Sequence, residues 1–594
     1  MNRRLLLLFG LLIGLGLIGL LRGGPLSFFS PSSPPEAPQS RANPEAGSGF
    51  RRVEEVHTQT YMVATANGHA SRAAKMIIDQ GGSAVDAAIA AQLVLTLVEP
   101  QSSGLGGGAF LLLYDEKQKK LFSYDGRETA PGGVTEALFL RDDGSPLGFG
   151  EAVRSGRSIG VPGVMALMEK VHQAHGRLPF AQLFAPAIQL SETGFAVSQR
   201  LHLLLKRKGA DFFNAAARRL YFDDQGQALP VGWTLKNPDL ANTLRLLAQK
   251  GAKGFYQGTL AKDIVAAAKA APKVPSAMTL ADLDAYQARA RRPVCGAYRG
   301  YRVCGMGAPS SGGMTTALIL GVLDQFNLGS APTPQALHLI AEASKLGFAD
   351  RNRYMADGDF VPQSAGFLDP AYLQARAKLI DPLKAISKAA PGTPPLLTKS
   401  EYGTDSTVEL GGTSHLSIVD KDGMMVSMTS SIEGAFGSGQ MVGGFLLNNQ
   451  LTDFSFRPKD AEGLAIANRV APFKRPRSSM SPTIVFDPQG QPIIVVGSPG
   501  GSRIIGFVVK SLIAHLDWGM GPQEAVSLLN FGSRNGPFEL EKRPGSEKFI
   551  AALEALGQKV RLGVMTSGVQ MIVRDDAGFR GGADPRREGV VLGE

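Results

Sequence analysis

Apolar residues recur at two different periods along this chain, and the period changes near residue 413. Between residues 162 and 390 the spacing is helical, which predicts helices separated by Gly and Pro turns. The expected helices are Val164–His175, Phe180–Glu192, Asp239–Lys250, Leu260–Ala271, Gly313–Phe326 and Pro334–Met355. An unbroken apolar stretch from Ser83 to Val98, with Ser83 and Asp86 at capping-box spacing, predicts a further helix that is buried.

Alternating apolar and polar residues, typical of strands, dominate after residue 413. Two hairpins are expected, Ser414–Val419 with Met424–Ser430 and Pro482–Phe486 with Pro492–Val496, each across an Asp- and Gly-containing turn. Further ranges are the strands Phe110–Tyr114, Lys120–Tyr124 and Gln570–Val573 and the helices Ser502–Leu516, Pro522–Leu529 and Ser546–Leu556. This α/β (α+β) mixture suits sheets covered by helices on both sides.

The first residues have the pattern of a targeting segment. Arg3 and Arg4 precede an apolar run of seventeen residues, Leu5 to Leu21. Residues 1–24 are therefore expected to be a signal peptide or a membrane anchor, because a spanning helix needs about 17–25 residues. No Ala-x-Ala cleavage site decides between the two, and the Arg pair predicts an exported protein, periplasmic or anchored to the inner membrane facing the periplasm. Residues 25–50 are rich in Pro and Ser, which indicates a flexible linker.

Composition fits a globular protein with a large core, since 44% of residues are hydrophobic and 19% are charged. The net charge of +10 is dispersed, without a Lys/Arg run or interleaved aromatic residues. This distribution argues against nucleic-acid binding.

The only two cysteines, Cys295 and Cys304, flank a candidate hairpin turn at Arg299-Gly300. A two-residue turn there would place the cysteines opposite each other on neighbouring strands. Facing Cα atoms in such a pair are about 4.5 Å apart, at the short end of the disulfide range. We expect a cross-strand disulfide if the compartment is oxidising.

Three motifs match the sequence patterns of catalytic or binding sites but lack the structural context or further ligands that such sites require. Gly104–Ala109 fits a dinucleotide-binding pattern, but it lies between a helix and a strand in the wrong order. Gly156–Gly160 fits a nucleophile elbow without the buried strand that should precede it. His172 and His175 have no nearby third metal ligand. We expect these to be structural, with the glycines allowing close backbone packing.

Gly411-Gly412-Thr413 opens the first strand of the second half. On its own the tripeptide fits a loop that enters a hairpin. Glycine also permits strained backbone in which the Thr hydroxyl could attack the preceding carbonyl. A cut there would place a new α-amine beside the Oγ atom of Thr413, which gives a nucleophile and a base in one residue. The pKa of an α-amine is near ~8, so a useful fraction is neutral at pH 7.

Several longer motifs follow or precede this tripeptide in a fixed order: Asp125–Pro131, Leu446–Ser455, Arg475–Pro482, Gly497–Arg503 and Ala583–Arg586. Together they resemble the gamma-glutamyltransferase family, also called gamma-glutamyl transpeptidases or glutathione hydrolases, which are N-terminal-nucleophile hydrolases. The resemblance runs from about Val63 to the C-terminus. It implies a four-layer αββα sandwich and self-cleavage into two intertwined subunits, residues 51–412 and residues 413–594.

The resemblance also implies substrates and site residues. Glutathione or another γ-glutamyl compound would donate its glutamyl group to Thr413 and then to water, an amino acid or a peptide, without cofactor or metal. Gly500 and Gly501 would form the oxyanion hole and Ser431 would assist the nucleophile. The substrate's α-carboxylate would meet Arg127, Ser478 and Ser479, and its α-ammonium would meet Glu433, Gln450 and Asp453. Opposite charges at the two ends would select an α-amino acid head.

The chain departs from the family pattern in places. Ser431 replaces a common Thr, and Glu433 stands where members carry Asn or Glu. Residues 456–472 correspond to a segment that forms a lid in some members. This segment is slightly short here and contains no Tyr, so the balance between water and amine acceptors stays open. His415 lies two residues from Thr413 on the same strand face, and we expect a structural role because Thr413 supplies its own amine.

Two other functions fit these residues. One is a related amidase on the same fold, a cephalosporin (glutaryl) acylase or a poly-γ-glutamate hydrolase, because fold alone does not fix the substrate. A preference for a glutaryl amide without the α-amino group would favour it. The other is a catalytically silent envelope protein, which a chain that is never cut would favour.

Overall fold

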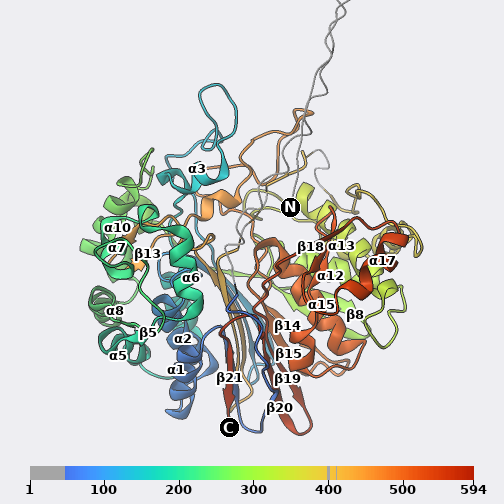
Figure 1. The fold of residues 1–594 in the computed structure, drawn as a ribbon, viewed down its shortest axis with the longest axis horizontal. Coiled ribbons are helices and arrows are strands. Elements are labelled where there is room, and N and C mark those ends of the chain that lie inside the picture. Colours follow the sequence, from blue (N-terminus) through green and yellow to red (C-terminus); the bar gives the residue numbers. More distant parts are fainter. Residues whose placement is uncertain (1–46, 398–401, 408, 410) are drawn as a thin grey trace, which may run out of the picture. The chain divides into compact units, whose positions relative to one another are not determined.

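The computed structural model describes residues 47–397, 402–407, 409 and 411–594 (Figure 1). The expected targeting segment, residues 1–24, and residues 25–46 of the expected linker lie outside the described part. Within the described part, no helix combines the length and the apolar character that a bilayer crossing requires.

Two seven-stranded sheets form the centre of the molecule. Sheet I has the order β1 (Val56–Thr58), β20 (Gly578–Ala583), β19 (Gln570–Asp575), β15 (Pro492–Gly497), β14 (Thr483–Phe486), β9 (Tyr301–Gly305) and β8 (Val294–Tyr298). Sheet II has the order β21 (Val590–Gly593), β2 (Met62–Thr65), β10 (Thr413–Val419), β11 (Met425–Ser431), β3 (Gly108–Asp115), β4 (Lys120–Gly126) and β7 (Arg289–Arg291).

Alternation along the strands divides the side chains between three apolar clusters. On β3, Leu111 and Leu113 pack against helices, whereas Leu112 and Tyr114 pack between the two sheets. On β14, Val485 faces helices and Phe486 faces the other sheet. Because successive side chains of a strand point to opposite faces, the two sheets stack with helices outside both. Figure 1 shows this order of layers, helix, sheet, sheet and helix.

The helices form two groups. Those that share an apolar cluster with sheet II are α1 (Gly68–Asp79), α2 (Ala84–Val98), α4 (Val164–His175), α5 (Ala185–Thr193), α6 (Gln199–Lys208), α8 (Pro238–Lys250) and α10 (Gly258–Lys269). Those that share one with sheet I are α12 (Gly312–Leu323), α13 (Pro334–Tyr354), α15 (Ile504–Leu516), α16 (Pro522–Ser527) and α17 (Glu547–Ala555). Helix α2 begins with the expected capping box of Ser83 and Asp86 and is buried along its whole length. Helices α1 and α6 fall outside the expected ranges.

Both sheets mix strands from the two sides of the Gly412–Thr413 bond. In sheet II, β10 pairs with β2 from the first part of the chain and with β11 from the second. In sheet I, β14 from the second part pairs with β9 from the first. The two parts of the chain therefore share both sheets.

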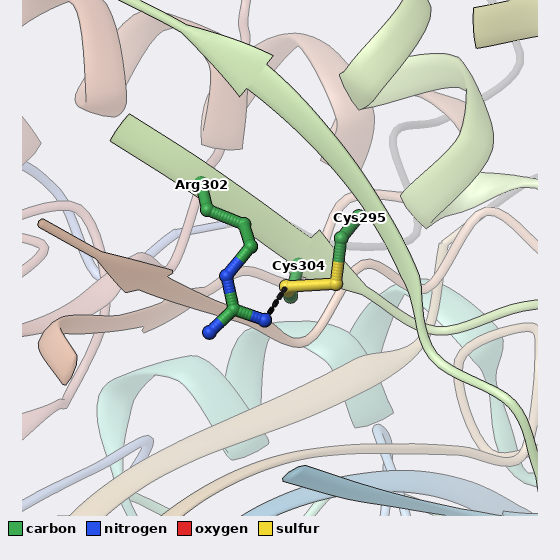
Figure 2. Close-up of a disulfide and its surroundings, with 3 residues drawn as sticks. All are labelled: Cys295, Arg302 and Cys304. Carbon is green, nitrogen blue, oxygen red and sulfur yellow. Dashed lines mark hydrogen bonds between the residues drawn. A yellow bond between two sulfur atoms is a disulfide. The ribbon is translucent and has the colours of Figure 1, made fainter. Parts of the chain in front are cut away.

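The structure joins Cys295 and Cys304 by a disulfide across β8 and β9, with Cα atoms 4.1 Å apart (Figure 2). The turn between the strands has positive φ at both Arg299 (52°) and Gly300 (82°), as a two-residue hairpin turn requires. The Arg302 guanidinium lies beside the Cys304 end of the disulfide, and its Nη1 is 3.9 Å from the Sγ of Cys304. Cys304 belongs to the apolar cluster between the sheets, so the disulfide fixes the edge of sheet I.

Candidate active site

Thr413 begins β10 directly opposite Ser431 on β11, and only 3% of its surface is exposed. The Ser431 hydroxyl donates a hydrogen bond of 2.9 Å to the carbonyl oxygen of Gly412 and accepts one of 2.8 Å from the Glu433 amide. A Cβ atom at Gly412 would lie 2.3 Å from the Glu433 carbonyl oxygen, so only glycine fits. The Gly412–Thr413 bond is thus buried, and a hydroxyl polarises its carbonyl.

The glycines before β3 allow the backbone to approach this place. A Cβ atom at Gly107 would lie 2.1 Å from the Ser431 carbonyl oxygen, and one at Gly108 would lie 2.3 Å from a carboxylate oxygen of Glu128. The expected close packing of this glycine run is confirmed, and it brings the backbone against the Ser431 carbonyl and the Glu128 side chain.

Arg127 follows β4 and is 1% exposed. Its Nε donates to the Pro476 carbonyl at 3.1 Å, and its Nη2 donates to the Arg477 carbonyl at 3.0 Å and to a carboxylate oxygen of Asp453 at 2.5 Å. One guanidinium therefore ties the Arg475–Pro482 motif to the short helix η5 (Gln450–Asp453).

Three acceptor oxygens around this guanidinium are buried without a hydrogen-bond partner: Oε1 of Glu433, Oε1 of Gln450 and Oδ1 of Asp453. The other oxygen of Asp453 accepts from the Gln450 amide at 2.8 Å. Buried acceptors are normally satisfied. Each of these oxygens can accept a hydrogen bond from a cation with several N–H donors, such as an ammonium group.

Burial also makes the charged form of these acids costly. It raises the pKa of Asp453 to about 6, although Arg127 acts in the opposite direction. Burial, together with the charge of Asp453, raises the pKa of Glu433 well above its usual value. A bound ammonium would reverse both shifts, since an opposite charge favours ionisation.

Sequence motifs did not single out Glu128 and Asn449. Both carboxylate oxygens of Glu128 are buried without a hydrogen-bond partner, and burial raises its pKa to about 8. Asn449 donates to Glu433 and accepts from the Gly434 amide at 2.9 Å, which holds Glu433 at its positive φ of 74°. Glu128 lies within the Asp125–Pro131 motif and Asn449 within Leu446–Ser455, but a motif does not show which side chains face the site.

The Ser479 hydroxyl bonds Glu409, whereas the Ser478 hydroxyl accepts from the Met480 amide at 3.1 Å. Glu409 belongs to the stretch before Thr413. The Pro-, Thr- and Ser-rich composition of residues 391–406 predicts an exposed loop, and this prediction is wrong in part. Leu396 is exposed, but Tyr402, Asp405 and Glu409 are buried. The two acids are buried because two arginines, Arg351 and Arg477, neutralise them.

Gly500 and Gly501 have φ values of 140° and 57° at the start of a short helix, η6 (Gly501–Arg503), that leads into α15. Elsewhere, Arg587 donates from its Nη1 to the Thr413 carbonyl at 3.3 Å. The side chain of Arg587 also lies against Gly568, which contacts Pro499. Arg587 directly follows the Ala583–Arg586 motif.

His415 is fully buried, and its ring nitrogens lie 2.8 Å from the Thr429 hydroxyl and 3.1 Å from the Ser417 hydroxyl. Burial lowers its pKa to about 3. The ring therefore stays neutral and occupied, which supports a structural role.

Two of the three motifs rejected above, Gly156–Gly160 and the His172/His175 pair, make structural contacts elsewhere in the fold. The Ser158 hydroxyl donates to the carbonyls of Val153 and Ser155. His172 contacts the Leu178 carbonyl and His175 contacts the Tyr124 hydroxyl.

The arrangement combines a hydroxyl beside a polarised carbonyl with a buried cluster of charged and polar side chains. Ser431 bonds the carbonyl before Thr413 and the amide of Glu433, Asn449 bonds Glu433, and Asp453 bonds both Gln450 and Arg127. Such residues can support hydroxyl attack on the preceding carbonyl, and their opposite charges can bind a small zwitterion.

Residues 70–594 match a protein-family model with the description "Gamma-glutamyltranspeptidase". A glutathione hydrolase proenzyme of Bacillus subtilis (strain 168) is 35% identical over 549 residues, which cover 90% of this chain and 91% of the relative. A glutathione hydrolase proenzyme of Escherichia coli (strain K12) is 37% identical over 547 residues, with 89% and 91% covered. The crystal structure of a cephalosporin acylase from Bacillus halodurans superimposes with a TM-score of 0.80 at 28% identity, covering 95% of this chain and 99% of that one.

Proposed function

The chain belongs to the gamma-glutamyltranspeptidase family, and on that premise we propose that Thr413 cuts its own chain and then carries the γ-glutamyl group. The protein is a gamma-glutamyltransferase and glutathione hydrolase. It splits the γ-glutamyl amide of glutathione and related compounds and passes the glutamyl group to water or to an amine.

The observation that carries the role of Thr413 is the hydrogen bond from Ser431 to the Gly412 carbonyl, 2.9 Å long. In self-cleavage the Thr413 Oγ attacks that carbonyl, and the peptide nitrogen leaves as the amine of Thr413. The resulting ester between Gly412 and Thr413 is then hydrolysed by water, which leaves a carboxylate on Gly412. Negative charge develops on the Gly412 oxygen during the attack, and the Ser431 hydroxyl is placed to stabilise it.

In catalysis the Thr413 hydroxyl acts as the nucleophile a second time. The new amine of Thr413 takes the proton of Oγ as Oγ attacks the γ-carbonyl, and it returns this proton to the departing amine. Water or an acceptor amine then releases the glutamyl group. Gly500 and Gly501 supply backbone N–H groups to the oxyanion, because positive φ values turn successive amides toward one side.

The donor's α-amino acid head is held by charge. Glu433, Gln450 and Asp453 direct their unsatisfied oxygens to the α-ammonium. Arg127, with Ser478 and Ser479, holds the α-carboxylate, since a guanidinium can form two parallel hydrogen bonds to it.

The test is the mass and N-terminal sequence of the purified protein beside Thr413→Ala and Thr413→Ser variants. We expect two fragments, one beginning Thr-Ser-His, from the unchanged chain. Thr413→Ser keeps the hydroxyl and should be cut, whereas Thr413→Ala should stay whole and fail to turn over γ-glutamyl-p-nitroanilide. An unchanged chain that stays whole would favour the silent envelope protein.

The superposition on a cephalosporin acylase keeps a second candidate, an acylase that prefers glutaryl amides. The buried acids argue for the first function, because a donor without the α-ammonium would leave their oxygens unsatisfied. Comparing kcat/KM for γ-glutamyl- and glutaryl-p-nitroanilide separates the two, and a higher value for the glutaryl donor would establish the acylase.

The place of action is also a proposal: the protein is exported, and its apolar start is a signal or an anchor facing the periplasm. The Cys295–Cys304 disulfide supports an oxidising compartment. Fractionation of cells followed by a carbonate wash would test it, and recovery of the intact chain in the cytoplasm would refute it.

A further inference from the structure

Two buried arginines are neutralised by the stretch of chain that ends at the proposed cut. We call residues 402–407, 409, 411 and 412 the pre-scissile segment. Arg351, near the end of α13, donates to Glu409 of this segment and to the Ser479 hydroxyl, the latter at 2.7 Å. Arg477 donates to Asp405 at 2.9 Å and to Glu409 at 3.4 Å.

Both guanidinium groups depend on these acids. Arg351 and Arg477 are almost wholly buried, and a buried charge without a partner is strongly destabilising. Burial by itself would raise the pKa of Glu409, but the two guanidinium groups hold it at about 2. The site therefore contains an ionised carboxylate between two arginines and a serine hydroxyl.

This carboxylate lies at the edge of the donor pocket. The Ser479 hydroxyl donates to Glu409, and the carbonyl of Arg477 accepts from Arg127 at 3.0 Å. The charge of Glu409 also contributes to the raised pKa of Asp453. Glu409 thus accepts the hydrogen bond of the Ser479 hydroxyl, the same hydroxyl that we propose binds the donor's α-carboxylate.

We propose that Arg351 and Arg477 determine specificity by binding the donor's α-carboxylate in the cut enzyme, together with Arg127 and Ser479. In the uncut chain the carboxylate of Glu409 occupies this position. This inference rests on the proposed self-cleavage at Thr413. The cut leaves the pre-scissile segment attached at one end only and adds a carboxylate at Gly412, beside the Glu433 backbone. When the segment withdraws, two guanidinium groups and the Ser479 hydroxyl surround one opening that requires an anion.

Three donors separate this role from a structural one. γ-Glutamyl-p-nitroanilide has both head groups, glutaryl-p-nitroanilide lacks the amine, and 4-aminobutanoyl-p-nitroanilide lacks the carboxylate. Arg477→Met combined with Asp405→Asn removes one charge of each sign, so the uncut chain keeps its balance. We expect kcat/KM to fall about 30-fold or more for the two carboxylate donors and to change less than about threefold for the third. Asp405→Asn alone, the matched control, should keep the preference of the unchanged enzyme.

An equal loss on all three donors, or no loss on any, would overturn the inference. A gel that shows both fragments, together with turnover by the unchanged enzyme, checks the proposed function separately. An unchanged chain that is neither cut nor active would contradict the proposed function itself, independently of the roles of Arg351 and Arg477.

A second measurement does not depend on activity or on cleavage of the variant. Calorimetry with glutarate compares Thr413→Ala with the double variant Thr413→Ala/Glu409→Ala, both uncut. Binding that appears only when Glu409 is removed supports the inference. Equal binding by the two chains, or no binding to either, contradicts the assignment of Glu409 as the occupant.

Discussion

The hydroxyl of Ser431 lies 2.9 Å from the carbonyl oxygen of Gly412, across the strand pair β10 and β11. The register that places Thr413 opposite Ser431 also fixes this hydrogen bond. The bond to be cut thereby lies at the start of a sheet strand, and the neighbouring strand supplies a hydrogen-bond donor to its carbonyl oxygen.

The first prediction concerns this donor. Ser431→Ala should slow self-cleavage by roughly 10²-fold, the usual effect of losing one oxyanion donor. The measurement is the uncut fraction over time on a denaturing gel. Ser431→Thr keeps a hydroxyl and should be cut at nearly the normal rate.

Ser430→Ala is the matched control, because Ser430 is the neighbouring residue and its hydroxyl bonds Gln92 instead. If Ser430→Ala slows cleavage as much as Ser431→Ala, strand packing rather than the donor explains the effect.

The second prediction concerns recognition of the amine. Asp453→Asn should lower kcat/KM for γ-glutamyl-p-nitroanilide by about 10²-fold, since truncating a buried charge pair costs roughly 2–5 kcal/mol. Turnover of glutaryl-p-nitroanilide, which has no amine, should be much less affected. A parallel fall for both donors would instead indicate that Asp453 acts through Arg127, which it binds at 2.5 Å.

The third prediction concerns pH and stability. Burial raises the pKa of Glu128 to about 8 in the folded chain, whereas the usual value for Glu is about 4.3. Between these values the folded state holds a proton that the unfolded state has lost, so stability falls as pH rises. Glu128→Gln in the Thr413→Ala background should therefore show a flatter Tm profile from pH 5 to pH 8 and a higher Tm at pH 8.

Asp453, whose pKa is raised to about 6, acts with the same sign over the lower part of this window. The exposed acid Glu136 provides the control, and Glu136→Gln should leave the profile unchanged. A Glu128→Gln profile as steep as that of the parent would exclude Glu128 as the source.

The fourth prediction concerns the disulfide. Cys295 and Cys304 are separated by 9 positions, and closing so short a loop is worth roughly 2–3 kcal/mol. A Cys295→Ser/Cys304→Ser variant should unfold at a lower temperature but keep its activity, because the bond lies at the edge of sheet I, away from Thr413. Thiol labelling of the native protein should modify neither cysteine, and a large loss of kcat in a folded variant would contradict this separation.

The sequence predicts the local parts of this site well. Residues such as Thr413, Arg127 and Asp453 stand within motifs, and alternation predicts the strands that carry them. The boundaries of α4 and the capping of α2 follow from periodicity and from Ser83.

Contacts between distant segments could not be predicted in the same way. Arg587 reaches the Thr413 carbonyl from 174 positions away, and Arg351 reaches Glu409 from 58. No local pattern marks such pairs, because folding of the whole chain brings them together. The burial of Asp405 was missed for this reason, since a Pro-, Thr- and Ser-rich stretch suggests exposure unless the partner arginine is known.

The strand order of sheet II has a consequence for the cut enzyme. Since β10 lies between β2 and β11, the fragments on either side of Thr413 are joined by the hydrogen bonds of a sheet interior. Dilution would not separate such fragments, because no preformed surfaces exist that could dissociate and meet again. Their association has no ordinary dissociation constant, and a mixture of separately produced fragments would regain activity only by folding together.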